Sequence, residues 1–538
     1  MSQKRKRRST ASQLTYEVDT SNDTYDEIVT LPNPDDSGSD ASDFDADSDD
    51  ETSHMTYTEA CKAYTDDQSK LEENHIFNWV EGEKEYLDDI KDEIILKESK
   101  KKKIRDSEPV ELFETFFSIE IKQYVIDACK ENNFTLNLQD LNTFIGIVIL
   151  TSFNKRKSQR DYWSTDPFLS CNVVASAMSR DKFEEIKSGL KYSKEKDRNP
   201  NDHGWRVRTL LNLFQTNILK FGIWRTALSV DEMMAKSYAR TSLKQFIRGK
   251  PIRFGLKFWG LCTSDGFVLV LDLYCGKNST TGNKFSKCAL GSRVVMNLLQ
   301  PFFVMIPPGK ISQFSLYCDN YFSNLDLFVH LNKLGLKCTG TIRENRIKEK
   351  NVMNKKSQRG AYVVKHDKNS GINYITVMDS KPVSIVSTAA GVTPLLPSKR
   401  YSAQERNKVE VLFPKAVHEY NNYMGGNDVH DGHCNNLLPS IRSKKWTWVV
   451  FIRLIQASIV NATVIFNAVS ADKKKVGTKD FAISISKSYI KKGQVKREEH
   501  GITKQTQLKL CSKCLIRTRM ICQKCDLSFC VQCFKKNH

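Results

Sequence analysis

The spacing of apolar residues changes near residue 225, and this change limits the fold more than any other feature of the chain. Within Leu141–Ile149, apolar side chains recur every three or four positions, as on one face of a helix. From residue 227 onward they form short β-branched and aromatic runs, separated by turn residues such as Ser264-Asp265-Gly266. The pattern predicts a helical block over residues 109–224, followed by a sheet.

The predicted sheet also contains helices. The apolar runs predict, in chain order, strands at 227–233, 254–262 and 267–274, a helix at 293–304, a strand at 314–318, a helix at 325–334 and a strand at 337–342. Three successive strands followed by alternating helices and strands indicate a mixed α/β sheet. Residues 345–413 are interpreted as an insertion with short strands at 372–378 and 383–387, and helical spacing returns at 416–424 and 446–469.

Charge divides the chain into an acidic head and a basic body. The 538 residues carry a net charge of +19, but residues 1–100 hold 11 basic and 27 acidic side chains and have a net charge of −16. The remainder, at +35, suits a polyanion such as nucleic acid and exceeds what an acidic small substrate needs. Asp35–Glu51 is almost wholly Asp, Ser, Gly and Ala, so residues 1–108 are predicted to be a disordered acidic tail.

Two cellular locations are not expected from the sequence. No run of about 18 uninterrupted apolar residues exists, and the nearest candidate, Trp446–Val469, contains Arg453, so no membrane association is expected. No apolar run follows Lys4–Arg8, so no secretory signal is expected, and the 15 cysteines are predicted to be reduced. Lys4–Arg8 fits a nuclear-import signal or a solvated basic end equally well.

Three acidic positions stand out because of where they lie. Asp231 ends one buried apolar run and Asp319 directly follows another, while Asp428 and Asp431 follow Gly425-Gly426 and lie one helical turn apart. Strands of such a sheet end side by side, so these carboxylates can converge, with Asp428 and Asp431 facing one point. Hard oxygen ligands suit Mg²⁺ or Mn²⁺, and two such ions can drive phosphoryl transfer. This order of elements is what a ribonuclease-H-like nuclease core requires.

Six cysteines near residue 538 form three pairs of the Cys-x₂-Cys type, after a Lys-rich linker at 471–508. The predicted zinc ligands are Cys511, Cys514, Cys522, Cys525, Cys530, Cys533 and His538. This spacing indicates a zinc-binding domain over 509–538, and we expect a cross-brace with two Zn²⁺, in which the first and third pairs share one ion. Two tetrahedral sites need eight ligands, and the eighth could be His500, a water or the terminal carboxylate. Nearby Lys and Arg residues favour DNA as its partner, although a protein-binding role stays open.

Several motifs together resemble the piggyBac transposase family. They are Asp161–Thr165, Leu228–Glu232, Cys318–Ser323, Gly340–Arg346, Tyr420–Asp431 and Arg442–Trp446. The resemblance implies that 225–344 and 414–438 form a ribonuclease-H-like catalytic core interrupted by the insertion 345–413. It also implies that the helical parts 109–224 and 439–470 serve dimerisation and DNA binding.

The resemblance also implies roles for single residues. Asp231, Asp319 and Asp428 match the three catalytic aspartates that bind two divalent ions, and Asp431 matches a supporting acid. The matching DNA-binding positions are Arg343, Arg346 and Trp446, the last of which would stack on an unpaired base. Asn427 departs from the family, which usually has an apolar residue there.

The implied activity is cut-and-paste transposition in the nucleus by a homodimer that binds double-stranded DNA. Each element end would be cut through a hairpin, and the element would be joined at TTAA. A first alternative is a host-adopted DNA-binding or chromatin protein without transposition activity. A second is a zinc-domain adaptor in which the α/β part is only a scaffold.

Overall fold

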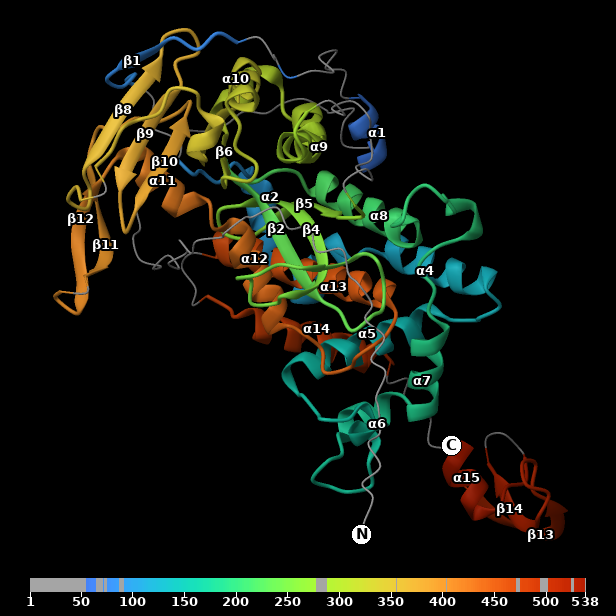
Figure 1. The fold of residues 1–538 in the computed structure, drawn as a ribbon. Helices are drawn as coiled ribbons and strands as arrows, with labels where there is room; N and C mark the ends of the chain where they lie inside the picture. The colour runs from blue at the N-terminus through green and yellow to red at the C-terminus, as the bar shows by residue number, and fades with distance from the viewer. Residues whose placement is uncertain are drawn as a thin grey trace, which may run out of the picture.

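The fold is that of a computed structural model (Figure 1). It describes residues 55–537 except 64–70, 72–74, 87–90, 277–287, 355, 403, 471–474, 494–501 and 524–526. The Lys4–Arg8 cluster, the Asp35–Glu51 segment, His500, Cys525 and His538 lie outside these residues, so the predictions made for them stay predictions.

Residues 109–224 form the predicted helical block. Its helices are α3 (Pro109–Phe116), α4 (Ile119–Glu131), α5 (Leu138–Phe153), α6 (Asn172–Ala177), α7 (Arg180–Gly189) and α8 (Trp205–Phe221). Local signals set their ends: the Asn137 side chain accepts from the Asp140 amide at the start of α5, and Ser179 caps α7 in the same way. Gly222, at φ 88°, ends α8.

The prediction of disorder up to residue 108 is wrong for part of that segment. The structure contains α1 (Tyr57–Ala63), β1 (Trp79–Glu81) and α2 (Glu98–Asp106), and β1 pairs antiparallel with β8 (Tyr362–Asp367). A few apolar residues in the charged sequence hold these elements, because Leu96 and Ile104 are buried and Trp79 packs edge-on against Tyr374. Average composition conceals such isolated anchors.

The predicted mixed sheet forms around strand β2 (Ala227–Lys236). The other strands of this part are β3 (Lys244–Phe246), β4 (Phe254–Thr263), β5 (Val268–Leu273), β6 (Ser315–Cys318) and β7 (Lys337–Thr341). β2, β6 and β7 are parallel neighbours, whereas β4 runs antiparallel to β2 and β5 antiparallel to β4. Helices α9 (Leu290–Met305) and α10 (Leu325–Lys333) lie between β5 and β7 in the chain, as predicted.

Most strands of the insertion at 345–413 join the central sheet. Strands β8, β9 (Asn373–Met378) and β10 (Pro382–Ser387) extend the central sheet, since β10 pairs antiparallel with β7. The result is a ten-stranded sheet, drawn in Figure 1 from the yellow-orange strands β8–β10 to the green β2 and β4. Strands β11 (Leu396–Ser402) and β12 (Asn407–Phe413) form a hairpin of their own.

The C-terminal helices complete the core. They are α11 (Lys415–Tyr423), α12 (Gly426–Asn436), α13 (Trp446–Val469) and α14 (Thr478–Gly493). Helix α13 is long and apolar enough to cross a membrane, but 89% of its most apolar window is buried, and it packs on α3, α8 and α14 as a core helix. The predicted packing of 446–469 with the helical block is therefore confirmed, and the apolar stripes at Phe144–Ile149 and Trp448–Ile455 are buried within one chain.

The prediction of a linker over 471–508 is wrong for two segments. Helix α14 packs along α5, where Phe481, Ile485 and Tyr489 are buried among the lysines that suggested a linker. Strand β13 (Ile502–Leu510) already belongs to the cysteine-rich module, because it pairs with β14 (Arg517–Cys522). With α15 (Val531–Asn537), these strands enclose a small core that includes Cys511, Cys522 and Phe529.

Candidate active site and zinc centre

The sheet brings Asp231 and Asp319 to neighbouring positions. β2 and β6 are parallel, with Val230 opposite Cys318, so each aspartate is the next residue after this pair. Asp231 continues in β2, whereas the chain turns after β6, and the Asp319 carboxylate accepts a hydrogen bond from the Tyr321 amide at 2.9 Å. The predicted convergence of two strand-end acids is therefore present in the fold.

Helix α12 brings Asp428 to the same place. A Cβ on Gly426 would lie 2.2 Å from the Thr263 carbonyl oxygen, so glycine lets the start of α12 pack directly on β4. Asn427 is fully buried, and its Nδ2 donates to the Ser229 carbonyl oxygen at 2.9 Å, which ties α12 to β2. The residue that departs from the family thus fixes the helix beside Asp231.

A lysine that the sequence did not single out lies between two of the acids. The Lys250 ammonium is 3.0 Å from Asp231 Oδ2 and 3.0 Å from Asp428 Oδ1. Lys250 follows Gly249 in the turn between β3 and β4, and only its type and this turn position are visible in the sequence. Such a lysine is common in hairpins, so no sequence signal identifies it.

Burial and nearby negative charges disfavour the charged forms of Asp231 and Asp319. Burial raises the pKa of Asp231 well above its ordinary value, and the charges of Glu232, Asp319 and Asp428 add to this, while Lys250 opposes it. Burial and Glu232 raise the pKa of Asp319 to about 6, against backbone amides of Tyr321 and Phe322 that favour the carboxylate. A concentration of negative charge with too little compensation is the environment that attracts a divalent cation.

The aspartates fit a hard divalent cation by chemistry and position. Their oxygens are the ligands that Mg²⁺ and Mn²⁺ prefer, and a cationic group already lies between two of them. The oxygens of the three carboxylates do not all lie within 4.8 Å of one another, however. Across the ranges the structure describes, only a group of four cysteines has its potential ligand atoms all within 4.8 Å of one another.

Asp431 does not face the same point as Asp428, contrary to the prediction. Its Oδ1 accepts from the guanidinium of Arg453, which is fully buried in α13, and its Oδ2 accepts from the Met234 amide at 3.4 Å. This buried ion pair, together with the contact to the Met234 amide, links α12 to α13 and β2. Helical spacing placed the two acids one turn apart, but it could not reveal that Arg453 lies on the facing helix.

The three predicted DNA-binding residues are placed differently from one another. Arg343 Nε donates to Asn320 Oδ1 at 3.2 Å, and Arg346 Nη1 donates to the carbonyl oxygens of Asn320 and Ser323 at 2.7 Å. The side chains of both arginines therefore contact the loop that follows Asp319. Trp446 begins α13 half-buried against the main hydrophobic core, and none of the contacts described for it involves the aspartates.

The turn region between β3 and β4 carries further exposed groups that sequence analysis missed. Phe246 and Phe254 are 55% and 58% exposed, and their ring centroids are 4.7 Å apart across the hairpin. The apolar run predicted the strand that begins at Phe254, but no strand was predicted at 244–246, so nothing in the sequence indicated an outward-facing aromatic pair.

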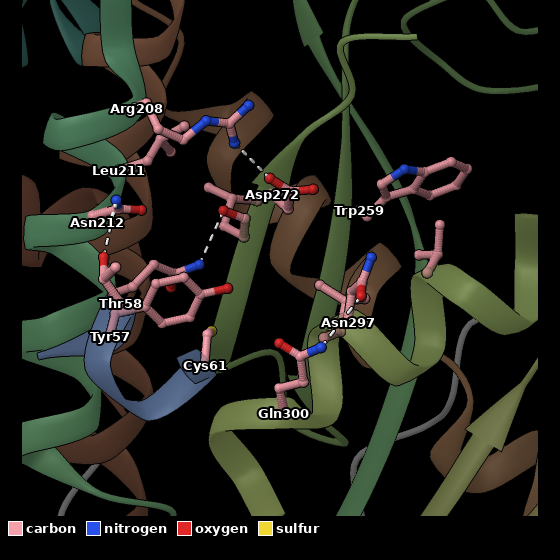
Figure 2. Close-up of a pocket in the computed structure, with 14 residues that line it drawn as sticks. Tyr57, Thr58, Cys61, Arg208, Leu211, Asn212, Trp259, Asp272, Asn297 and Gln300 are labelled. Atoms are coloured by element: carbon pink, nitrogen blue, oxygen red, sulfur yellow. Dashed lines mark hydrogen bonds and ion pairs between the residues drawn. The ribbon is translucent and has the colours of Figure 1, made fainter. Parts of the chain in front are cut away.

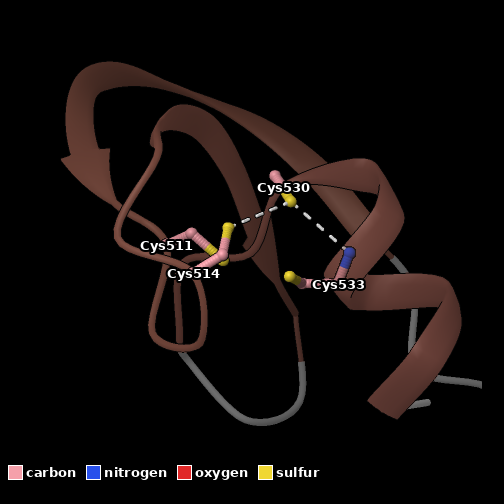
Figure 3. Close-up of side chains that lie close together, drawn as sticks. All are labelled: Cys511, Cys514, Cys530 and Cys533. Carbon is pink, nitrogen blue, oxygen red and sulfur yellow. Dashed lines mark hydrogen bonds between the residues drawn. The ribbon is translucent and has the colours of Figure 1, made fainter.

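The cysteines bring four sulfurs together at the C-terminal module (Figure 3). Cys511, Cys514, Cys530 and Cys533 converge, and the Sγ atoms of Cys514 and Cys530 are 3.6 Å apart. Tetrahedral zinc with Zn–S bonds of about 2.3 Å needs sulfurs separated by about 3.8 Å, so this group fits Zn²⁺. Pairing of the first and third Cys-x₂-Cys units is as predicted, and Cys522 packs in the core beside Cys511.

A cavity lies apart from Asp231, Asp319 and Asp428. Its volume is about 160 Å³, and Figure 2 shows it lined by α1, α8, β5 and α9. Arg208 Nη1 contacts Asp272 Oδ1 at 2.9 Å on one wall, and burial within the site raises the pKa of Asp272. None of the predicted catalytic residues lines this cavity.

Comparison with known proteins places the chain in a family. The family model described as Transposase IS4 matches residues 108–463, more than half of the chain. The human PiggyBac transposable element-derived protein 3 is 28% identical over 459 residues, which cover 80% of this chain and 76% of that protein. The human PiggyBac transposable element-derived protein 2 is 28% identical over 371 residues, covering 67% of this chain and 62% of that protein.

A solved structure shares the fold. It is the cryo-EM structure of a piggyBac transposase synaptic complex with hairpin DNA, which matches with a TM-score of 0.59 at 20% sequence identity. The match covers 80% of this chain and 98% of that chain. On the family model, the relatives and the fold together, this chain belongs to the piggyBac family of transposases.

Proposed function

We propose that the chain is a metal-dependent DNA transposase that excises and integrates DNA by two-metal phosphoryl transfer. The observation that carries this proposal is the placement of three aspartates on adjoining elements: Asp231 in β2, Asp319 directly after the neighbouring strand β6, and Asp428 in α12, with the Lys250 ammonium 3.0 Å from both Asp231 and Asp428. The strand order β5-β4-β2-β6-β7, with β4 antiparallel, supports the assignment of a ribonuclease-H-like core.

In this proposal, Asp231, Asp319 and Asp428 would supply the oxygen ligands of two Mg²⁺ or Mn²⁺ ions. Bound there, the ions would activate the attacking water or hydroxyl and stabilise the leaving oxygen of the cleaved phosphodiester. Asn427 and the Asp431–Arg453 pair hold α12, and therefore Asp428, against β2. Asp431 is a positioning residue in this account and not a metal ligand.

DNA is the proposed substrate. The chain beyond residue 100 has a net charge of +35, and the solved relative is described as a complex with hairpin DNA. Arg343 and Arg346 lie beside Asp319, where their charges would meet the phosphates next to the cut. We extend the proposal to hairpin formation at the element ends, joining at TTAA, assembly as a homodimer and a nuclear location.

The C-terminal module is proposed to bind zinc and to read the terminal DNA. Four converging cysteines support one Zn²⁺, and the second ion, held by Cys522, Cys525, His538 and an eighth ligand, stays a proposal. Lys504, Lys509 and Arg519 lie on its two strands and would contact phosphates.

In one alternative, the chain has the transposase fold but does not catalyse transposition. The two human relatives are described as transposable element-derived proteins, so a host-adopted DNA-binding or chromatin protein without transposition activity is the second candidate. Terminal inverted repeats beside TTAA duplications in the DNA around the coding sequence would favour the enzyme.

An excision assay in cells tests the proposal. The reporter carries the flanking DNA ends, and wild type is compared with Asp319→Asn at matched expression. The proposal expects precise excision by the wild type only, with chromatin immunoprecipitation of the ends retained by Asp319→Asn. Binding without excision by the wild type itself would favour the adopted protein.

A further inference from the structure

The ammonium of Lys250 occupies the position between Asp231 and Asp428. Both contacts are 3.0 Å, and the three side chains are 18%, 12% and 34% exposed, respectively. This is a close two-point contact shielded from solvent, unlike a surface ion pair that water can replace. A second cation would compete with this ammonium for the same two oxygens.

The hairpin between β3 and β4 aims Lys250 at the acids. The Ile247 amide donates to the Arg253 carbonyl oxygen at 3.0 Å, which closes the hairpin, and Gly249 adopts φ +95° directly before Lys250. A Cβ on Gly249 would meet nothing within 4 Å, so the backbone conformation alone calls for glycine there. The turn thereby directs the lysine back over the sheet.

The same hairpin is loosely held by the rest of the protein. No residue from 244 to 254 is buried, and the aromatic pair Phe246 and Phe254 faces outward. The contacts of Lys250 with Asp231 and Asp428 are therefore the main polar attachment of the tip to the core. A tip held in this way can move when these contacts are lost.

The other lysine near the acids is held differently. The Lys257 ammonium lies 3.8 Å from the centroid of the Trp259 ring and 5.6 Å from that of Tyr321. Aromatic faces retain this cation on β4 by cation–π attraction. Of the two lysines, Lys250 is the one whose ammonium contacts carboxylates that we assign to the metal.

We propose that Lys250 is an internal cation that holds the place of the divalent ion between Asp231 and Asp428 and has to leave before the ion can bind. The inference rests on the proposed function, since it takes the aspartates as metal ligands. Lys250 is then a positioning residue: it keeps the acids together in the metal-free chain, and metal loading releases the β3–β4 tip. Because an ammonium a few ångströms from the ion repels it strongly, the lysine weakens metal binding.

Mn²⁺ binding to the DNA-free, full-length chain tests this competition. The free Mn²⁺ signal in electron paramagnetic resonance gives the affinity for wild type, Lys250→Met, Lys250→Gln, Lys250→Arg and the matched control Lys244→Met. Lys244 lies on the same hairpin and its ammonium faces Phe254, so the control removes an equal charge without touching the acids. We expect at least about tenfold tighter binding for Lys250→Met and Lys250→Gln, and wild-type affinity for Lys250→Arg and Lys244→Met.

Thermal melting supplies a second readout. In EDTA, Lys250→Met should melt below Lys244→Met because its acids face one another without a cation, and Mn²⁺ should remove this difference. Affinity of both neutral Lys250 variants equal to or weaker than that of Lys244→Met would overturn the inference. So would a Lys250 variant that stays unfolded in saturating Mn²⁺, since the ion should replace the ammonium.

Asp319→Asn separates the inference from the proposed function, because Asp319 makes no contact with Lys250 among the ion pairs described. Wild-type Mn²⁺ affinity in Asp319→Asn would refute the proposed metal site. Loss of Mn²⁺ binding in Asp319→Asn, together with unchanged affinity in the neutral Lys250 variants, would leave the metal site standing and refute only the role of Lys250.

Discussion

Replacement of Arg453 by Met should destabilise the catalytic core strongly and leave the metal ligands in place. Arg453 is 1% exposed, and its guanidinium contacts the Asp431 carboxylate between α13 and α12. Removing one partner of a buried ion pair leaves the other charge buried without a counter-charge, which lowers the free energy of unfolding by about 3–5 kcal/mol. Asp431→Asn should cost a similar amount, because it leaves Arg453 buried without a counter-charge.

The double variant Arg453→Met/Asp431→Leu tests the cause of that loss. It removes both charges and fills the space with apolar groups. Its loss of unfolding free energy should therefore be smaller than the sum of the two single losses by about 2–3 kcal/mol. Urea unfolding followed by tryptophan fluorescence measures the free energies, since Trp224 and Trp259 are buried in this part of the protein. Additive costs in this cycle would refute the pairing.

A different result would reassign Asp431. If Asp431→Asn lost Mn²⁺ binding while its unfolding free energy stayed at the wild-type value, the acid would be a metal ligand. The structural account predicts the reverse order: a large loss of stability, with Mn²⁺ affinity retained by the fraction that stays folded.

Three further predictions concern other parts of the fold. Cys514→Ser, or a zinc chelator, should unfold the C-terminal module without lowering the melting temperature of the core, because so short a segment depends on its metal to fold. An NMR spectrum of a folded module without zinc would contradict this. Tyr489→Ala should lower the free energy of unfolding by about 3–5 kcal/mol and speed amide exchange in α14, because Tyr489 is buried against α5 and its hydroxyl donates to Glu114 at 2.8 Å. Unchanged exchange would count against this packing. Asp367 is buried, which opposes ionisation, but hydrogen bonds from Ser370 and His75 outweigh burial and lower its pKa. A lowered carboxyl pKa stabilises the fold above the ordinary value of about 3.9, and this contribution is lost as pH falls through the folded value, so Asp367→Asn should flatten the acid side of the melting-temperature profile.

Sequence periodicity predicted the helices and strands that are determined by residues near one another in the chain. The strands and helices predicted between 227 and 342 and the long helix at 446–469 have apolar residues at one regular spacing, and each appears within a few residues of its predicted bounds; the short strand β3 was not predicted. The strand-end aspartates were also predictable, because a parallel neighbour fixes which residues follow the last paired position.

Contacts across long sequence separations were not predictable in this way. Lys250 meets Asp428 across 178 positions, and Arg453 meets Asp431 only because α12 and α13 cross. Helix α14 is rich in lysine and resembles a linker, although four turns of it bury one face on α5. In the same way, β1 depends on β8 for its hydrogen bonds, and no local sequence signal predicts a strand of three residues.

The central claim is that Asp231, Asp319 and Asp428 hold the divalent ions that cut DNA. Strand nicking of an end fragment by purified full-length chain, in Mg²⁺ and in EDTA, tests it most directly, with Asp428→Ala beside the wild type. We predict nicking by the wild type in Mg²⁺ alone, and retained DNA binding without nicking by Asp428→Ala. Normal nicking by Asp428→Ala would contradict the assignment of this site.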